Sequence, residues 1–295
     1  MKHAIDPKID CVFKALLGAE ENSNLLIHFL NAMLGQELES PIVSVDILNP
    51  YNDKEMRDGK LSIVDIKARD EALNLYQIEI QLLNYDNIPS RIVYTWSDIY
   101  SKQLREGADY IALKPTYSIW LLGENISDSD KEYLHIYKFR DEKGMFLLNH
   151  GGIWLIELPK FETKEVKTER ERWIKLFKEG EHLDDDSLPE WMTTPEMKQA
   201  MATLSRFSEK EQEYDLYQGR QNFLRQQKTM ERELSRERDG RLQALKDVQR
   251  ERRMKEAAMR EKEAAMRERE AALQREEAAR AEIEKLKALL GQTKQ

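Results

Sequence analysis

The hydrophobic pattern of the first 122 residues predicts a helix, three strands, a second helix and a fourth strand. In residues 10–34, apolar side chains recur at i, i+3 and i+4, which is the spacing of an amphipathic helix. Gly18 and the polar run "ENSN" predict a division into two helices there, with Asn22 or Ser23 as the second N-cap. The predicted strands are 42–50, 61–69, 75–83 and 116–122, and a helical stripe runs from Ile92 to Leu104 and ends at Gly107.

Beyond residue 122 the pattern predicts two more strands, then helices. The strands, 134–139 and 151–158, either extend the sheet or form an added hairpin. Residues 160–205 read as two or three helices, and their apolar anchors are Trp173, Leu176, Phe177 and Trp191. We therefore expect a first domain over residues 1–158, a helical extension over 159–207 packed on it, and a long charged helix or coiled coil over 208–295.

The last part of the chain has a very strong helix-forming tendency, because Pro is absent and Gly is rare. It repeats every seven residues, with Met259, Met266 and Leu273 at equivalent positions. If Met259 is an a position, however, the d positions fall on Lys262 and Arg269. The repeat thus leaves open a lone charged helix and a two-stranded coil. The final "IEKLKALL" has a more regular apolar seam, to which pairing could be confined.

Polar side chains gather on one face of the hairpin formed by 61–69 and 75–83. If its turn centres near Ala72, residues whose numbers sum to 144 lie opposite one another, so Asp65 faces Glu79 and Lys67 faces Gln77. Directly opposed residues have Cβ atoms about 4.5 to 5.5 Å apart. The sequence therefore predicts two neighbouring carboxylates.

Two carboxylates at this distance repel unless a positive charge offsets theirs. Mg²⁺ commonly binds through one or two carboxylates, waters and a substrate phosphate, and it lowers the pKa of bound water. Gln81, one pleat from Glu79, would orient that water or a phosphate oxygen, and Lys67 would neutralise developing charge. The alternative is an ordinary solvated sheet face, in which Lys67 is only the exposed partner of Asp65. Alternation alone does not decide between them.

Composition narrows the functional classes. The 295 residues carry a net charge of −8, which argues against a protein that coats DNA non-specifically. Charged residues make up 35% of the chain, above the roughly 25% typical of globular domains. The excess lies mostly after residue 205, so part of the chain should lie outside any core. The single cysteine, Cys11, excludes an internal disulfide. With neither a signal-peptide pattern nor an apolar run of membrane-spanning length, we expect a cytoplasmic protein that does not contact membranes.

Several segments together carry a family resemblance. They are "DPKIDCVFKALLG", "NLLIHFLNAML", "VDIKARD", "YQIEIQ", "SRIVYTWSDIYSKQLREGADY" and "PTYSIWLL", and they cover roughly residues 6–122. In this order the chain resembles the PD-(D/E)xK nuclease superfamily, and more specifically its recombination-promoting nuclease and transposase family. The resemblance implies an α/β, restriction-endonuclease-like core of order α-β-β-β-α-β, followed by a helical extension and the long charged helix.

The resemblance also implies roles for individual residues. Asp65 and Glu79 would bind Mg²⁺ or Mn²⁺, and Gln81 stands where most superfamily members have lysine. This departure puts the efficiency of water activation in doubt, although glutamine is usual there in the specific family. Asp10, in the first helix, would approach the site and help with metal or water. Arg91, near the start of the later helix, would meet a phosphate or would be an ordinary surface charge.

Two functions remain open from the sequence. The first is a metal-dependent DNA endonuclease that cuts phosphodiester bonds by metal-activated water and promotes recombination or transposition. Its charged helix would form a homodimer, which suits cutting both strands of DNA. The second is a catalytically inactive, nuclease-like scaffold that acts through the C-terminal helix. The lysine missing at position 81 and the acidic composition favour the scaffold slightly.

Overall fold

The computed structural model of the protein describes residues 3–48, 65–83, 87–184 and 187–292, with side chains as far as residue 285. Part of the predicted first hairpin strand, residues 61–64, lies outside the described residues, as do the seam side chains Leu286 and Leu290. The chain divides into two units, residues 1–226 and 227–295. Both expected domain boundaries, after residues 158 and 207, fall inside the first unit.

The first unit is built on a mixed sheet of six strands in the order β1-β2-β3-β4-β6-β5. The three central strands, β3, β4 and β6, run parallel, and the remaining neighbours pair antiparallel. The two strands predicted after residue 122 therefore extend the sheet. The strand bounds are β1 Asp46–Leu48, β2 Ile66–Arg69, β3 Leu75–Gln81, β4 Thr116–Leu122, β5 Leu134–Tyr137 and β6 Gly151–Glu157.

The prediction of a strand over 42–50 is too long, because β1 begins only at Asp46. The side chain of Asn31 explains the difference. Its amide donates to the carbonyl of Ile42 at 2.8 Å, and its carbonyl accepts the N–H of Ile42 at 2.8 Å. Both backbone groups of Ile42 thus have a partner on a helix, where a strand would need a neighbouring strand.

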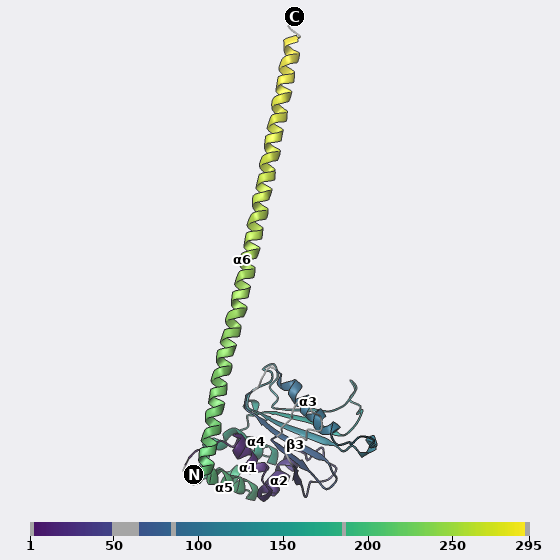
Figure 1. The fold of residues 1–295 in the computed structure, drawn as a ribbon, viewed down its shortest axis with the longest axis vertical. Helices are drawn as coiled ribbons and strands as arrows, with labels where there is room; N and C mark the ends of the chain where they lie inside the picture. Colours follow the sequence, from purple (N-terminus) through teal and green to yellow (C-terminus); the bar gives the residue numbers. More distant parts are fainter. Residues whose placement is uncertain (1–2, 49–64, 84–86, 185–186, 293–295) are drawn as a thin grey trace. The chain divides into compact units, whose positions relative to one another are not determined.

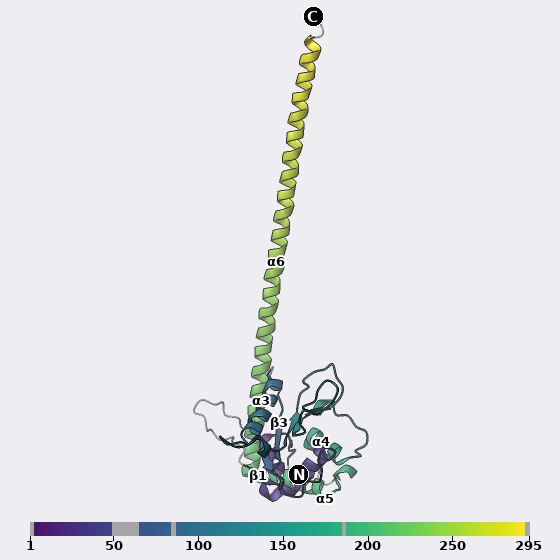
Figure 2. The same ribbon diagram turned by 90° about the vertical axis from the view of Figure 1, so that its right-hand side faces the viewer.

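Helices cover both faces of the sheet, as Figures 1 and 2 show. One face packs against α1, α2, α4 and α5 in a single large core that includes Phe13, Phe29 and Trp173. The other face packs against α3, mainly through Trp96 and Trp120. The helix bounds are α1 Asp10–Leu17, α2 Ser23–Leu34, α3 Ile88–Ser101, α4 Glu169–Glu179, α5 Pro195–Glu209 and α6 Glu211–Gln292. Short 3₁₀ turns are η1 Glu20–Asn22, η2 Tyr110–Ala112, η3 Leu158–Lys160, η4 Gly180–His182 and η6 Glu190–Met192.

The predicted division of residues 10–34 is confirmed, with Gly18 after α1 and Asn22 as the N-cap of α2. The predicted end of the next helix at Gly107 is wrong, because α3 stops at Ser101. The side chain of Gln103 hydrogen-bonds the segment before β4, which takes the backbone out of the helical path. It donates to the carbonyl of Lys114 at 3.0 Å and accepts the N–H of Lys114 at 2.9 Å, just before β4.

The helix α1 carries the single cysteine on a partly buried position. Burial, followed by the negative charge of Asp10, raises the pKa of the Cys11 thiol to about 11. A thiol with so high a pKa is almost entirely protonated at neutral pH and is a poor nucleophile. Cys11 therefore fills space in the fold as a small, weakly polar side chain.

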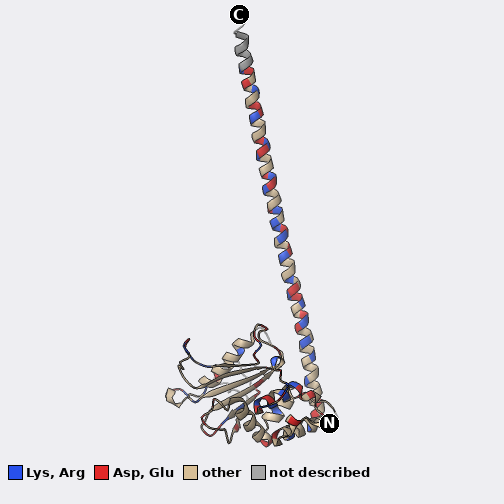
Figure 3. Ribbon diagram, turned by 180° about the vertical axis from the view of Figure 1, so that it is seen from behind, with Lys and Arg blue, Asp and Glu red and all other residues tan. Residues whose placement is uncertain are grey.

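The helix α6 begins in the first unit and continues as the second. Its start is anchored, because Tyr217 is buried and its hydroxyl accepts the N–H of Asp6 at 3.0 Å. In residues 227–285 both signs of charge alternate along the helix (Figure 3), and i,i+4 ion pairs join residues such as Glu237 and Arg241. Large side chains such as Met259 and Met266 are exposed. Within the described residues, no helix has the length and apolar character needed to cross a membrane.

Candidate active site

The hairpin of β2 and β3 has the predicted register. Ile66 pairs with Ile78, and Lys67 pairs with Gln77. The turn between the strands is fixed by Asp70, whose carboxylate accepts the N–H of Asn74 at 2.8 Å and the side-chain amide of Asn74 at 2.9 Å. Leu73 takes a positive φ of 66° within this turn. Local turn chemistry therefore sets the register that aligns the two strands.

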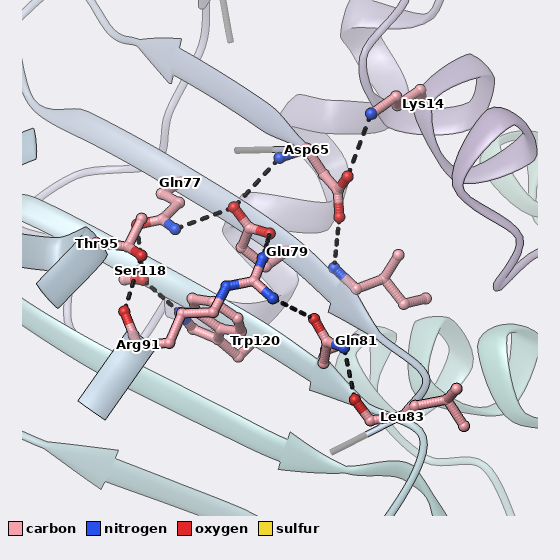
Figure 4. Close-up of polar contacts among 11 residues, drawn as sticks. Lys14, Asp65, Gln77, Glu79, Gln81, Leu83, Arg91, Thr95, Ser118 and Trp120 are labelled. Atoms are coloured by element: carbon pink, nitrogen blue, oxygen red, sulfur yellow. Dashed lines mark hydrogen bonds and ion pairs between the residues drawn. The ribbon is translucent and has the colours of Figure 1, made fainter. Parts of the chain in front are cut away.

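The register brings Asp65 and Glu79 together at the end of the hairpin (Figure 4). The N–H of Asp65 donates to Oε1 of Glu79 at 3.2 Å, and Oδ2 of Asp65 accepts the N–H of Ile80 at 3.0 Å. The face that carries Glu79 is not solvated, since α3 covers it and leaves Glu79 only 3% exposed. The solvated-face alternative is therefore wrong for β3.

A chain of buried hydrogen bonds holds the carboxylate of Glu79 from the sheet side. The indole Nε1 of Trp120 donates to Oγ of Ser118 at 2.8 Å, and this hydroxyl donates to Oε1 of Gln77 at 3.1 Å. Nε2 of Gln77 then donates to Oε1 of Glu79 at 3.2 Å. Sequence reasoning missed Ser118 and Trp120. The feature that would have identified them is the parallel pairing of β3 with β4, which sets Ser118 beside Gln77 and Trp120 beside Glu79.

The carboxylate of Glu79 is strongly perturbed. Burial, followed by the charge of Asp65, raises its pKa to about 8. The amide of Gln77, the guanidinium of Arg91 and the N–H of Asp65 act in the opposite direction but do not outweigh these two effects. Two acidic groups forced together in a place with little water therefore favour a nearby positive charge.

Arg91 of α3 lies over the carboxylate of Glu79 and hydrogen-bonds Gln81, the residue that stands where most superfamily members have lysine. Its Nη1 donates to Oε1 of Gln81 at 2.7 Å, and its Nη2 lies 4.0 Å from Oε2 of Glu79. The guanidinium also stacks 5.6 Å from the ring centroid of Trp120. The amide nitrogen of Gln81 donates to the carbonyl of Leu83 at 2.5 Å. The structure thus brings Arg91, Gln81 and Glu79 together, as Figure 4 shows.

A second positive charge comes from α1, and sequence reasoning missed it. Nζ of Lys14 lies 3.3 Å from Oδ1 of Asp65. The expected contributor from this helix, Asp10, lies one turn away and pairs with Arg220 of α6, with Nε 3.6 Å from Oδ2. Among the described residues, no group of three or more His, Cys, Asp or Glu side chains is placed to hold a metal ion. The structure therefore does not bring Asp10 to the pair.

Lys67 occupies its predicted place in the hairpin, opposite Gln77 on β3 and opposite Leu48 on β1. It is partly buried. The role of Lys67, whether it neutralises developing charge or only pairs with Asp65, stays a prediction.

The donor set of Asp65 and Glu79 fits a hard divalent cation. Oδ2 of Asp65 and Oε1 of Glu79 are taken by N–H donors, whereas Oδ1 of Asp65 and Oε2 of Glu79 face cationic side chains. These last two oxygens are therefore already arranged toward positive charge. Mg²⁺ and Mn²⁺ prefer oxygen ligands, and Mg²⁺ needs only one or two carboxylates besides water and phosphate.

A comparison with protein families matches residues 7–234 to the family described as PD-(D/E)XK nuclease family transposase. The chain belongs to this family. The match includes Asp65, Glu79 and Gln81 as well as Lys14 and Arg91. PD-(D/E)XK nucleases generally use divalent metals, which agrees with the donor set above. Comparisons with curated proteins and with solved structures each found no match.

Proposed function

We propose that the protein is a Mg²⁺- or Mn²⁺-dependent DNA endonuclease that takes part in recombination or transposition. The observation that carries the proposal is the pairing of Asp65 with a buried Glu79 whose pKa is raised to about 8. The family match, which covers both residues, supports the same function. Buried carboxylate pairs of this kind are costly to a fold, and they suit a site that takes up a cation and a phosphate.

The reaction is hydrolysis of a phosphodiester. A water oxygen forms a bond to phosphorus, the bond from phosphorus to one nucleoside oxygen breaks, and the proton lost by water is balanced by the proton gained by the leaving oxygen. The metal, when bound, supplies Lewis-acid polarisation of the phosphoryl oxygen and a lower pKa for water. Asp65 and Glu79 would hold it, and the chain Trp120–Ser118–Gln77 orients Glu79.

Gln81 and Arg91 would serve the phosphate. Gln81 is uncharged, so it contributes orientation of water or of a phosphate oxygen through its amide. The guanidinium of Arg91 presents several N–H donors at a fixed angle, which suits phosphate oxygens. Because Arg91 already binds Gln81 at 2.7 Å, it also holds that amide beside Glu79.

Nicking of supercoiled plasmid DNA tests this function. We expect wild-type protein to nick with Mg²⁺ or Mn²⁺ and to stop in excess EDTA, because two carboxylates alone cannot neutralise the phosphate. Asp65→Ala should nick at least about 100-fold more slowly, since it removes one of the two metal-binding carboxylates. Asp46→Ala is the matched control, because Asp46 is an exposed acid on the neighbouring strand and pairs with Arg69 at 3.3 Å. It should keep wild-type activity.

Identical nicking by wild type and Asp65→Ala would sink the nuclease proposal. It would instead favour the scaffold, in which α6 makes the partner contacts.

We further propose that α6 pairs with a second copy of itself. Its exposed apolar residues recur every seven positions at Met259, Met266 and Leu273, between charges of both signs. A chain that lacks residues 230–295 should stay folded, with a free energy of unfolding within about 1 kcal/mol of wild type, because nearly all side chains of residues 230–285 are exposed. It should sediment as a monomer, whereas the full chain sediments as a dimer.

Circular dichroism with urea unfolding and sedimentation velocity check these two results. An unfolded truncated chain would mean that α6 completes the core. A full chain that stays monomeric at tens of micromolar would mean that the heptad pattern supports a lone helix.

A further inference from the structure

The position of Lys14 is fixed by the packing of α1. The helix is anchored by the buried side chains Phe13, Leu16 and Leu17. At its end Gly18 closes against the hairpin. Its N–H donates to the carbonyl of Lys14 at 2.7 Å, and a Cβ there would lie 3.3 Å from Cγ1 of Ile66, the residue after Asp65. Lys14 lies one helical turn before Gly18, and from there its side chain reaches Asp65, next to the start of β2.

The side chain at position 81, where the motif has lysine, carries no positive charge. Gln81 stands there, and both ends of its amide are engaged, with Arg91 and with the carbonyl of Leu83. A neutral amide cannot offset charge on a phosphate as an ammonium does. Arg91 itself is divided between Gln81, Glu79 and the face of Trp120.

Lys14 differs from Arg91 in its surroundings. Its side chain is 42% exposed, and its Nζ forms an ion pair with Oδ1 of Asp65. A pair this exposed contributes little to the stability of a fold. A lysine ammonium is a compact charge on a flexible four-carbon stem, so it can exchange one oxygen partner for another without backbone movement.

We propose that Lys14 is a phosphate-binding residue of this site, supplying from α1 the charge that position 81 lacks. The inference rests on the proposed nuclease function and deepens it. Lys14 contacts a non-bridging oxygen of the scissile phosphate and stabilises the negative charge that builds there as water attacks. It keeps its proton throughout, so it forms and breaks no covalent bond. Asp65, released from this ion pair, would be available to hold the divalent cation.

Kinetics of plasmid nicking by the full-length protein test this role. Lys14→Ala and Lys14→Met should lower kcat by about 100-fold while KM changes little, because the charge acts mainly in the transition state. Lys14→Arg should recover kcat to within about tenfold of wild type. Ethylammonium in solution should partly restore Lys14→Ala but not Lys14→Met, whose side chain fills the space.

Lys102→Ala is the matched control. Lys102 is also 42% exposed and also pairs with a carboxylate, that of Asp98, at 2.9 Å. Loss of such a pair on α3 should leave kcat unchanged. A fall in kcat for Lys102→Ala equal to that of Lys14→Ala would overturn a specific role for Lys14.

Mn²⁺ binding separates a phosphate role from a structural one. With no DNA present, Lys14→Ala should bind Mn²⁺ at least as tightly as wild type, since it removes a positive charge 3.3 Å from Asp65. Lost Mn²⁺ affinity, or a kcat that neither arginine nor ethylammonium raises, would show that Lys14 only holds Asp65 in place and would overturn the proposal.

These measurements distinguish a failure of the Lys14 proposal from a failure of the proposed nuclease function. If Asp65→Ala lowers nicking but the Lys14 variants match wild type, Lys14 has no role although the nuclease stands. If Asp65→Ala also matches wild type, both conclusions fall together.

Discussion

Replacing Glu79 with glutamine should abolish nicking and, at alkaline pH, make the metal-free protein more stable. Activity should fall roughly 1000-fold or more, because a carboxylate that binds the metal is lost and several kcal/mol of transition-state stabilisation go with it. Stability should change in the other direction. The carboxylate of Glu79 is 3% exposed and lies against Asp65, so its charged form destabilises the fold.

The pH dependence of this effect follows from the raised pKa. The folded protein holds the Glu79 proton with a pKa of about 8, against 4.5 for an ordinary glutamate. The stability that this proton confers is present in full below pH 4.5 and is lost as pH rises through 8. The free energy of unfolding of the wild type should therefore fall by on the order of 2 kcal/mol between pH 6 and pH 9 through this group. Glu79→Gln should not show this fall.

Urea unfolding in EDTA at pH 6 and pH 9 measures the difference. Glu157→Gln is the control, since Glu157 is also a buried glutamate on a parallel strand but is paired with Lys160. Its replacement leaves a buried ammonium without its carboxylate and should destabilise the protein at both pH values. A Glu79→Gln protein that is less stable than wild type at pH 9 would contradict the electrostatic account of the site.

Gly151→Ala should destabilise the fold by roughly 3 to 5 kcal/mol, which is among the larger effects of a single substitution. Gly151 has a φ of +83°, and a Cβ there would lie 2.2 Å from the carbonyl oxygen of Thr116. Thr116 and Gly151 are the first pair of the parallel β4–β6 ladder. An added methyl group therefore forces two central strands apart at the point where their pairing begins.

Gly107→Ala separates this collision from backbone strain. Gly107 has nearly the same φ, +81°, but nothing lies within 4 Å of a Cβ built on it. Alanine there should cost only about 1 to 2 kcal/mol, the strain of a left-handed residue. Urea unfolding of both variants provides the comparison. Equal losses would show that β4 and β6 accommodate the methyl group and that φ alone sets the cost.

The carboxylate pair was predictable because its determinants are local. Alternation along two strands and a turn centred near Ala72 are enough to set Asp65 opposite Glu79, and the observed pairing of Lys67 with Gln77 agrees. The roles of Asp65 and Glu79 in metal binding remain predictions. Arg91 was within reach for the same reason, because it lies near the start of a helix ten residues after Gln81.

The rest of the site depends on contacts between distant segments. Asp10 and Lys14 share a helix face four residues apart, yet only the packing of Gly18 on Ile66 decides that Lys14 meets Asp65. Ser118 is 41 residues from Gln77, and its role follows from strand order, which periodicity does not encode. The early end of α3 also depends on a contact between separate segments, because the Gln103 side chain hydrogen-bonds the backbone of Lys114.

The inert thiol of Cys11 has a practical consequence for studying this protein. With a pKa of about 11 it should react with maleimides roughly a hundredfold more slowly than an ordinary exposed cysteine. A cysteine introduced on α6 would then take a spin or fluorescent label selectively, with the native residue left in place. Distances between labelled copies would report directly on how two long helices align.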